Sequence, residues 1–319
     1  MNLLLAAGLL VLAAVQLSRA LPLLEMDGFG WAENLCFDGL GSLFVSEMTG
    51  GKLHRIWLND DGQSYNKEIH LDGFKNIGGL AVSGDGKTIY AAVTFADKTN
   101  GIVSTPTSSN GGNGARTYSI VGKTSSKPNG MQLHLGTFWC TEEGGVGGNG
   151  SVFTVDLATG KETLVHSGIN ADGAWINPAT GSLFVGQVKS MNVAVFDIAA
   201  NPPVFKGNFP GPSSQFKMPG LQLLDDLTLA ARGGESSEAT GPKTELFGAD
   251  WLGKRLLKFT LDGSSVETVT TPKGVELKEL TSVRWGKGPG FDANSVYVSE
   301  GGGLTEHVKS RRIVQIPIL

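Results

Sequence analysis

Leu43-Phe44-Val45 is the first of six copies of a short apolar phrase, and the spacing of these copies decides the fold. The later copies are Ile89-Tyr90-Ala91, Thr137-Phe138-Trp139, Leu183-Phe184-Val185, Leu246-Phe247-Gly248 and Val296-Tyr297-Val298. Counted along the sequence, their aromatic residues are separated by 46, 48, 46, 63 and 50 residues. A period of this length, made of strand-like phrases and turns, is typical of a repeat array. Four short strands would fill each period, and a closed ring would bury the apolar face that one unit leaves exposed. The sequence therefore predicts an all-β protein, a six-bladed β-propeller with four-stranded antiparallel blades.

The order of strands is similar within each repeat. An apolar inner strand comes first, the aromatic strand second, and a third strand follows in which apolar and polar residues alternate. Examples of the third strand are residues 52–57, 150–156, 192–197 and 255–260. A period of two is what a half-buried strand requires. The long interval of 63 residues contains the polar stretch from Arg232 to Lys243, which predicts an insertion within blade five.

Composition and charge limit the class of protein. The 46 glycines and a charged fraction of only 18% suit many tight turns and buried sheets, unlike a disordered chain. A net charge of −4, without a basic stripe, argues against a nucleic-acid partner. The repeat indicates a single domain, and we expect this domain to be a monomer that acts on a small-molecule substrate.

Residues 1–20 differ in kind from the rest. Leu3 to Val15 is almost wholly apolar, is too short to span a bilayer comfortably, and is followed by a small residue, Ala20. This pattern predicts a secretory signal peptide over residues 1–20, with an uncleaved anchor as the alternative. The propeller domain would then occupy residues 21–319. We expect it to be secreted or to lie in the endomembrane lumen, without membrane contact after cleavage.

Two cysteines and one sequon bear on that compartment. Cys36 and Cys140 are able to pair in an oxidising environment. Each lies in an apolar strand phrase of a different repeat, however, so two buried free thiols are at least as good an interpretation. Asn149-Gly150-Ser151 fits the acceptor pattern for N-glycosylation. The sequence leaves both questions open.

Candidate metal ligands stand at the start of the inner strands. These strands begin near one mouth of the central channel, so oxygen-bearing side chains at equivalent positions of different repeats converge on the axis. Glu33, Asn129, Asp172 and Asp225 each directly precede an apolar strand, in blades one, three, four and five. Each one alone is better explained as a turn residue. Together, one to a repeat, they predict a site for a hard divalent cation such as Ca²⁺.

Six phrases, in their order and spacing, resemble a known family. They are Trp31-Ala32-Glu33-Asn34, Pro128-Asn129-Gly130-Met131, Ala171-Asp172-Gly173, Leu224-Asp225-Asp226-Leu227-Thr228-Leu229, Leu280-Thr281-Ser282-Val283-Arg284-Trp285-Gly286 and Val296-Tyr297-Val298-Ser299-Glu300-Gly301-Gly302. With these phrases the chain resembles the regucalcin, gluconolactonase and diisopropyl-fluorophosphatase-like six-bladed propellers. Within them it is similar to the fungal-type lactonase-like branch.

The resemblance implies a catalytic divalent metal in the channel. A glutamate, two asparagine-type positions and an aspartate would hold it, and these fall on Glu33, Asn129, Asp172 and Asp225. Asp172 departs from the family, which more often has Asn there. The added carboxylate would tighten metal binding and lower the Lewis acidity of the cation. Oxygen-only ligation favours Ca²⁺, with Mg²⁺, Mn²⁺ and Zn²⁺ as alternatives.

The predicted activity is metal-dependent hydrolysis of a lactone or related ester. The cation would polarise the carbonyl, and Asp225 would act as general base on water or as a direct nucleophile. Asp226 is the second choice for this role, because the register of the doublet is ambiguous in the sequence. Trp175 is the predicted substrate-binding side chain because it follows Asp172 closely.

Two other functions remain open on the sequence. A propeller resembling strictosidine synthase would join an amine to an aldehyde without a metal and would rely on a pocket glutamate. The retained set of oxygen ligands argues against it. A non-catalytic propeller would use the same cation to hold a ligand or to stabilise the ring, and the sequence does not separate this function from an enzyme.

Overall fold

The computed structural model describes residues 21, 23–108, 117–144, 149–188, 192–208, 224–232, 243–261, 265–302 and 311–318. The predicted signal peptide, residues 1–20, lies outside these ranges, as does most of the predicted insertion of blade five, residues 233–242. Within these ranges all regular secondary structure is β-strand. No helix in this part of the chain is long and apolar enough to cross a membrane.

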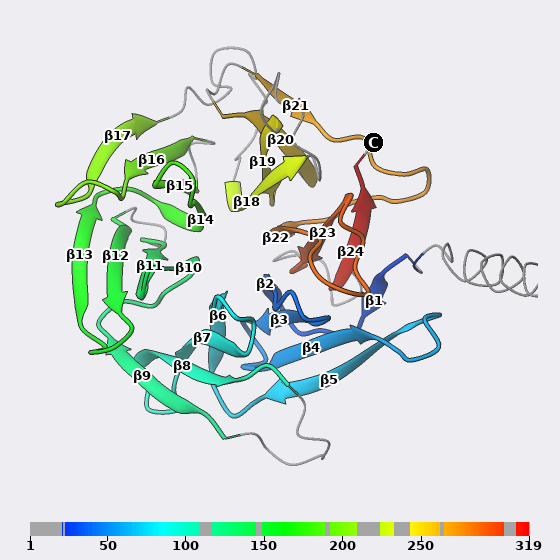
Figure 1. Ribbon diagram of the computed structural model, residues 1–319, viewed down its shortest axis with the longest axis horizontal. Coiled ribbons are helices and arrows are strands. Elements are labelled where there is room, and N and C mark those ends of the chain that lie inside the picture. The colour runs from blue at the N-terminus through cyan, green and yellow to red at the C-terminus, as the bar shows by residue number, and fades with distance from the viewer. Residues whose placement is uncertain are drawn as a thin grey trace, which may run out of the picture.

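The described strands form six four-stranded antiparallel sheets, arranged as a ring around a central axis (Figure 1). Blade one contains β2 (Ala32–Phe37), β3 (Leu43–Glu47), β4 (Leu53–Leu58) and β5 (Tyr65–Leu71), and blade two contains β6 (Asn76–Val82), β7 (Thr88–Thr94), β8 (Asn100–Pro106) and β9 (Ser119–Thr124). Blade three contains β10 (Met131–His134), β11 (Thr137–Glu142), β12 (Ser151–Asp156) and β13 (Glu162–Ser167), and blade four contains β14 (Ala171–Asn177), β15 (Ser182–Gln187), β16 (Val193–Asp197) and β17 (Val204–Asn208). Blade five contains β18 (Leu224–Arg232), β19 (Lys243–Asp250), β20 (Arg255–Thr260) and β21 (Val266–Thr268), and blade six contains β22 (Leu280–Trp285), β23 (Ser295–Glu300), β24 (Arg312–Pro317) and β1 (Glu25–Asp27).

The sixfold aromatic phrase forms the second strand of every blade, β3, β7, β11, β15, β19 and β23. The predicted third strands correspond to β4, β12, β16 and β20. The prediction of an all-β, six-bladed propeller with four-stranded blades is therefore confirmed.

Apolar faces of neighbouring blades pack against each other. Trp139 of blade three and Ala174 of blade four belong to one buried cluster. Between blades one and six, the Phe37 and Tyr297 rings meet edge to face with centroids 5.2 Å apart. Because each blade hides its faces only against its neighbours, the core is complete only when the ring is closed.

The ring is closed by strands from both ends of the described chain. β1 pairs antiparallel with β24 and so becomes the outermost strand of blade six. Leu24, 1% exposed, joins the core between blades one and six, and its N–H donates to Gln315 Oε1 at 3.1 Å. Arg312 on β24 pairs with Glu25 on β1 and donates from Nε to Glu300 Oε2 at 2.7 Å. The closure thus combines backbone pairing, apolar burial and an ion-pair network.

We predict that Leu24→Ala destabilises the closed ring, whereas the adjacent Leu23→Ala does not. Loss of a fully buried leucine side chain should lower the free energy of unfolding by about 2–5 kcal/mol. Leu23 is 52% exposed, so its truncation should change the free energy by less than about 0.5 kcal/mol. Denaturant unfolding followed by tryptophan fluorescence measures both, and equal effects of the two variants would contradict this account of closure.

Candidate functional site

Near the start of each inner strand, two residues stand opposite a single residue of the second strand; in blade three these two residues directly precede β10. In blade one, Ala32 pairs with Glu47 and Leu35 with Val45, so Glu33 and its successor share one partner position. The doublets of all six blades are Glu33-Asn34, Gly78-Gly79, Asn129-Gly130, Asp172-Gly173, Asp225-Asp226 and Thr281-Ser282. This arrangement is a β-bulge, which bends the strand and re-aims the side chains it carries.

The four predicted ligands all occupy the first position of such a doublet. Glu33, Asn129, Asp172 and Asp225 are thus structurally equivalent in blades one, three, four and five. Blade two has Gly78 at this position. The inner strands β2, β6, β10, β14, β18 and β22 lie nearest the centre of the ring (Figure 1). The structure therefore brings one oxygen-bearing side chain from each of four blades to the same level of the axis.

Close backbone contacts hold three of these blades together at the bulges. A Cβ atom added to Gly130 would lie 2.6 Å from the Asp172 carbonyl oxygen, and one added to Gly173 would lie 2.3 Å from Asp226 Cα. The Asn129 Nδ2 donates a hydrogen bond to Asp172 Oδ1. Glycine is required in the second position of these doublets because any side chain there would meet the neighbouring backbone.

Burial and mutual repulsion shift the pKa values of the three carboxyl groups upward. Burial raises the pKa of Glu33, 3% exposed, to about 8. Burial also raises the pKa of Asp172 well above its ordinary value, and the charge of Glu33 adds to the effect. For Asp225 burial is again the main cause, followed by the charge of Asp172. The charge of Lys127 opposes the rise in the pKa of Glu33 and of Asp172.

Two oxygen atoms of the set are buried without a hydrogen-bond partner in the part of the chain that the structure describes. They are Glu33 Oε2 and Asn129 Oδ1. The side chains nevertheless do not form a closed metal cage. Across the described ranges, no group of three or more His, Cys, Asp or Glu side chains stands in a metal-binding arrangement.

The two aspartates of the fifth doublet have different environments. Asp226, 1% exposed, accepts hydrogen bonds from Ser282 Oγ and Arg284 Nη1, and its Oδ1 accepts the Leu227 N–H at 2.8 Å. No described residue donates a hydrogen bond to the Asp225 carboxylate, and the residue as a whole is half-buried. Asp226 is therefore held in place by its partners, and the geometry favours Asp225 as the group open to substrate and water. Arg284 was not among the predicted site residues, although it lies in the phrase from Leu280 to Gly286 that resembles the family.

Trp175 lies further along β14 than the bulge that carries Asp172. It lines a cavity of about 190 Å³, and none of the four predicted ligands lines that cavity. The Arg284 guanidinium stands over its ring, 5.3 Å from the centroid. A role for Trp175 in binding the substrate of a site at Asp172 stays a prediction.

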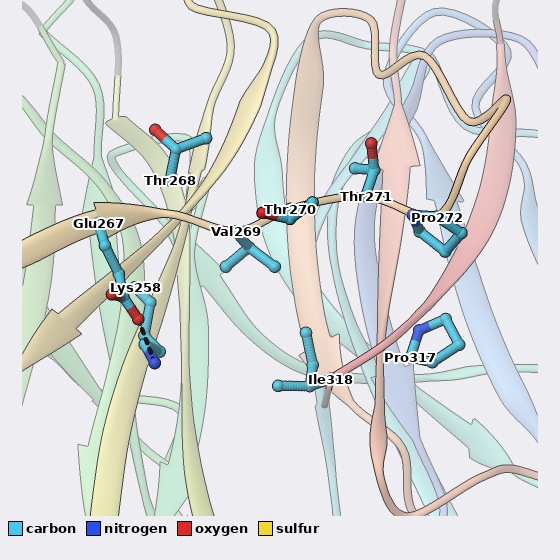
Figure 2. Close-up of a pocket in the computed structure, with 9 residues that line it drawn as sticks. All are labelled: Lys258, Glu267, Thr268, Val269, Thr270, Thr271, Pro272, Pro317 and Ile318. Carbon is cyan, nitrogen blue, oxygen red and sulfur yellow. Dashed lines mark ion pairs between the residues drawn. The ribbon is translucent and has the colours of Figure 1, made fainter.

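A larger cavity lies away from the axis, at the junction of blades five and six. Its volume is about 520 Å³, and residues of β20, β21, the following segment to Pro272, and the end of β24 line it (Figure 2). Lys258 and Glu267 form an ion pair at its edge. It contains none of the predicted site residues, so its size alone does not make it the functional site.

The cysteines are both free. Cys36 lies in blade one and Cys140 in blade three, each packed in a different apolar cluster. Asn149 of the sequon is exposed, and its glycosylation stays a prediction.

Comparison with known proteins gives structural neighbours. Neither a protein-family model nor a curated protein sequence matches the chain. A luciferin-regenerating enzyme superimposes with a TM-score of 0.68 at 14% identity, over 92% of this chain and 93% of the other. The calcium-binding protein regucalcin from Agrobacterium tumefaciens gives 0.64 at 16% identity, over 95% and 98%. This chain has their fold.

A gluconolactonase from Xanthomonas campestris is a further neighbour, with a TM-score of 0.60 at 14% identity, over 92% of this chain and 87% of the other. The resemblance to the fold of the regucalcin and gluconolactonase propellers is thus confirmed over nearly the full length of the chain. Identities this low establish the fold alone. Similarity to the fungal-type branch stays a prediction.

We predict that Gly173→Ala distorts the bulge of blade four. The added methyl group meets backbone atoms of Asp225 and Asp226, so the free energy of unfolding should fall by about 1–3 kcal/mol. Gly84→Ala is the matched control, because a Cβ there meets nothing within 4 Å. Chemical denaturation of both variants measures the difference. Unchanged stability of Gly173→Ala would contradict the close packing of β14 and β18.

We also predict that the native thiols resist alkylation. Burial raises the pKa of Cys36 from 9.0 to about 11, and burial raises that of Cys140 further. The thiolate is the reactive form, and a rise of this size lowers its fraction roughly 100-fold at neutral pH. At pH 8, iodoacetamide should label neither thiol in the folded protein and both after unfolding, as read by mass spectrometry. Fast labelling of the folded protein at either cysteine would show that the thiol is accessible and ionised.

Proposed function

We propose that this protein is a divalent-metal-dependent hydrolase of a lactone or related ester. The observation that carries the proposal is the set of four oxygen-bearing side chains at equivalent bulge positions of four blades, Glu33, Asn129, Asp172 and Asp225. The shared fold with a gluconolactonase and a calcium-binding regucalcin supports it. We further propose a secreted or lumenal monomer that acts on a small molecule.

The residues fit a hard divalent cation in their chemistry. Three carboxylates and one amide supply only oxygen donors, which suit Ca²⁺, and also Mg²⁺ or Mn²⁺, better than the nitrogen and sulfur ligands typical of Zn²⁺. Glu33 Oε2 and Asn129 Oδ1 are buried and without partners in the described chain. Positive charge among the three repelling carboxylates would lower the cost of burying them. Glu33, Asn129, Asp172 and Asp225 would hold the ion after small side-chain movements.

Asp225 would take the proton from the attacking water. When bound, a divalent cation polarises the substrate carbonyl and favours the ionised form of the neighbouring carboxylates. Asp225 suits the task because the residue is half-buried and its carboxylate receives no hydrogen bond from a described residue. Asp226 is committed to Arg284 and Ser282. Asn129 would orient Asp172 through the hydrogen bond between their side chains.

We predict that Glu33→Gln and Asp225→Asn weaken Ca²⁺ binding by on the order of tenfold or more, as measured by isothermal titration calorimetry on chelator-treated protein. Asp72→Asn, which removes an exposed carboxylate, is the matched control and should bind Ca²⁺ like the wild type. Without Ca²⁺, neither site variant should be less stable than the wild type, because each removes one of several buried like charges.

Turnover of a panel of small lactones tests the reaction. Chelation should abolish hydrolysis, and Asp225→Asn should lower kcat by about 10²–10⁴-fold, the usual range for loss of a general base. Bound Ca²⁺ without turnover across the panel would favour the non-catalytic binding propeller. Failure to bind any divalent cation would refute the site and favour a synthase-like activity that needs no metal.

A further inference from the structure

The cavity that Trp175 lines is on the propeller axis, further along the inner strands than the bulges. This far cavity has a volume of about 190 Å³ and is lined by residues that include Cys36, Phe37, Leu80, Gln132, Trp175 and Arg284. They belong to the inner strands of blades one, two, three, four and six. The far cavity is therefore formed by the ring as a whole.

The far cavity is distinct from the proposed metal site. In every contributing inner strand the bulge comes first and the cavity-lining residues follow, as Asp172 precedes Trp175 and Thr281 precedes Arg284. Three residues of extended chain span about 10 Å. The buried pair of Asp226 and Arg284 connects the two levels: Asp226 belongs to the fifth bulge, whereas Arg284 lines the far cavity.

Arg284 has hydrogen-bonding capacity to spare. It is only 4% exposed, and all its hydrogen bonds in the described chain start from Nη1, which donates to Asp226 and to the carbonyl oxygens of Leu227 and Val283. A guanidinium has five N–H groups, so the three on Nε and Nη2 have no acceptor among the described residues. A nearly buried charged group with unused donors at the wall of a cavity is a ready site for an anion.

The surroundings restrict which anion fits. The Trp175 ring, 5.3 Å from the guanidinium carbon, limits the orientation of the guanidinium plane. Lys287 adds a second positive charge at the wall. Cys36 stays a neutral thiol because burial raises its pKa to about 11. The nearby negative groups are both occupied, since Asp226 pairs with Arg284 and Asp38 accepts the N–H groups of its own turn at 2.7 and 2.8 Å.

Most of the other lining residues are apolar. They are Phe37, Leu80, Ala81, Val82, Leu133 and Trp285, and Gln132 adds one amide group. A cavity of roughly 150 Å³ is large enough to hold benzene, so the far cavity accepts a small ring or short aliphatic body. It is too small for most drug-sized ligands, which need roughly 300 Å³ or more.

We propose that the far cavity binds a small monocarboxylate with a compact apolar body. The carboxylate accepts paired hydrogen bonds from Nε and Nη2 of Arg284, the fork geometry in which arginine holds carboxylates best. The apolar body lies against Leu80 and Leu133. Nη1 keeps its bond to Asp226, so the ligand adds to the ion pair without breaking it.

Benzoate is the probe, with benzyl alcohol as its neutral analogue of similar shape. Calorimetric titration of chelator-treated protein should show one benzoate per chain, and benzyl alcohol should bind at least tenfold more weakly. Tryptophan fluorescence should change on binding, because Trp175 and Trp285 both line the cavity. Asp225→Asn should bind benzoate like the wild type, which separates this site from the proposed metal site.

Two variants test the geometry without leaving Asp226 unpaired. Arg284→Lys keeps a positive charge for Asp226 but removes the fork, and it should weaken benzoate binding at least tenfold. Val82→Phe fills the cavity and leaves Arg284 intact, and it should also weaken binding at least tenfold. Val121→Phe makes the same change at a half-buried strand position that does not line the far cavity, and it should have no effect.

Three results would overturn the proposal. One is no benzoate binding at millimolar concentration. Another is binding that requires Ca²⁺ or is lost in Asp225→Asn, which would place benzoate at the other level of the channel. The third is wild-type affinity in both Arg284→Lys and Val82→Phe.

Discussion

One extra residue at the start of each inner strand is the constraint on which the site depends. A strand turns successive side chains to alternate faces, and in a propeller both faces are covered by neighbouring blades. The bulge breaks this alternation and frees one side chain for the axis. The two bulged residues need room, and the residue opposite each doublet on the second strand has a small side chain or none. These residues are Ser46, Ala92, Thr141, Gly186, Ala249 and Ser299. The same bulge, repeated around the ring, places Glu33, Asn129, Asp172 and Asp225 at equivalent positions of four blades.

Electrostatics divides the channel into two levels. Burial raises the pKa of Glu33, Asp172 and Asp225 at one level, and nearby negative charges raise each further. Asp226 lies in the same cluster of carboxylates, but the ion pair with Arg284 compensates its charge. Because breaking a buried ion pair leaves an uncompensated charge, this pair is expensive to disturb. Arg284, which lines the far cavity, is thereby fixed in place by its bond to Asp226.

The fold was predictable in nearly all its parts, whereas the function of the predicted ligands stays a prediction. The aromatic phrase, the third strands and the number of blades follow from local periodicity, and the structure agrees with each. The equivalence of Glu33, Asn129, Asp172 and Asp225 was also predictable, because each precedes an apolar run. In the structure Asn129 does precede β10, whereas the other three lie inside β2, β14 and β18, because those strands begin earlier and continue through the bulge. The choice between Asp225 and Asp226 was not predictable, since it depends on Ser282 and Arg284 from another blade. Trp175 was predicted to bind substrate beside Asp172; it follows Asp172 on β14 and lines the far cavity, and its role stays a prediction.

The sequence by itself determined the repeat, the strand order and the positions where oxygen-bearing side chains recur, because these are properties of spacing and residue type along one chain. Only the tertiary structure decided which carboxylate is paired and which is open, that the two cysteines stay apart, and that Arg284 has unused donors at a cavity wall. Each of these depends on distances between blades. Such distances are set by closure of the ring, in which β1 joins β24 across almost the whole length of the chain, and no local pattern encodes them.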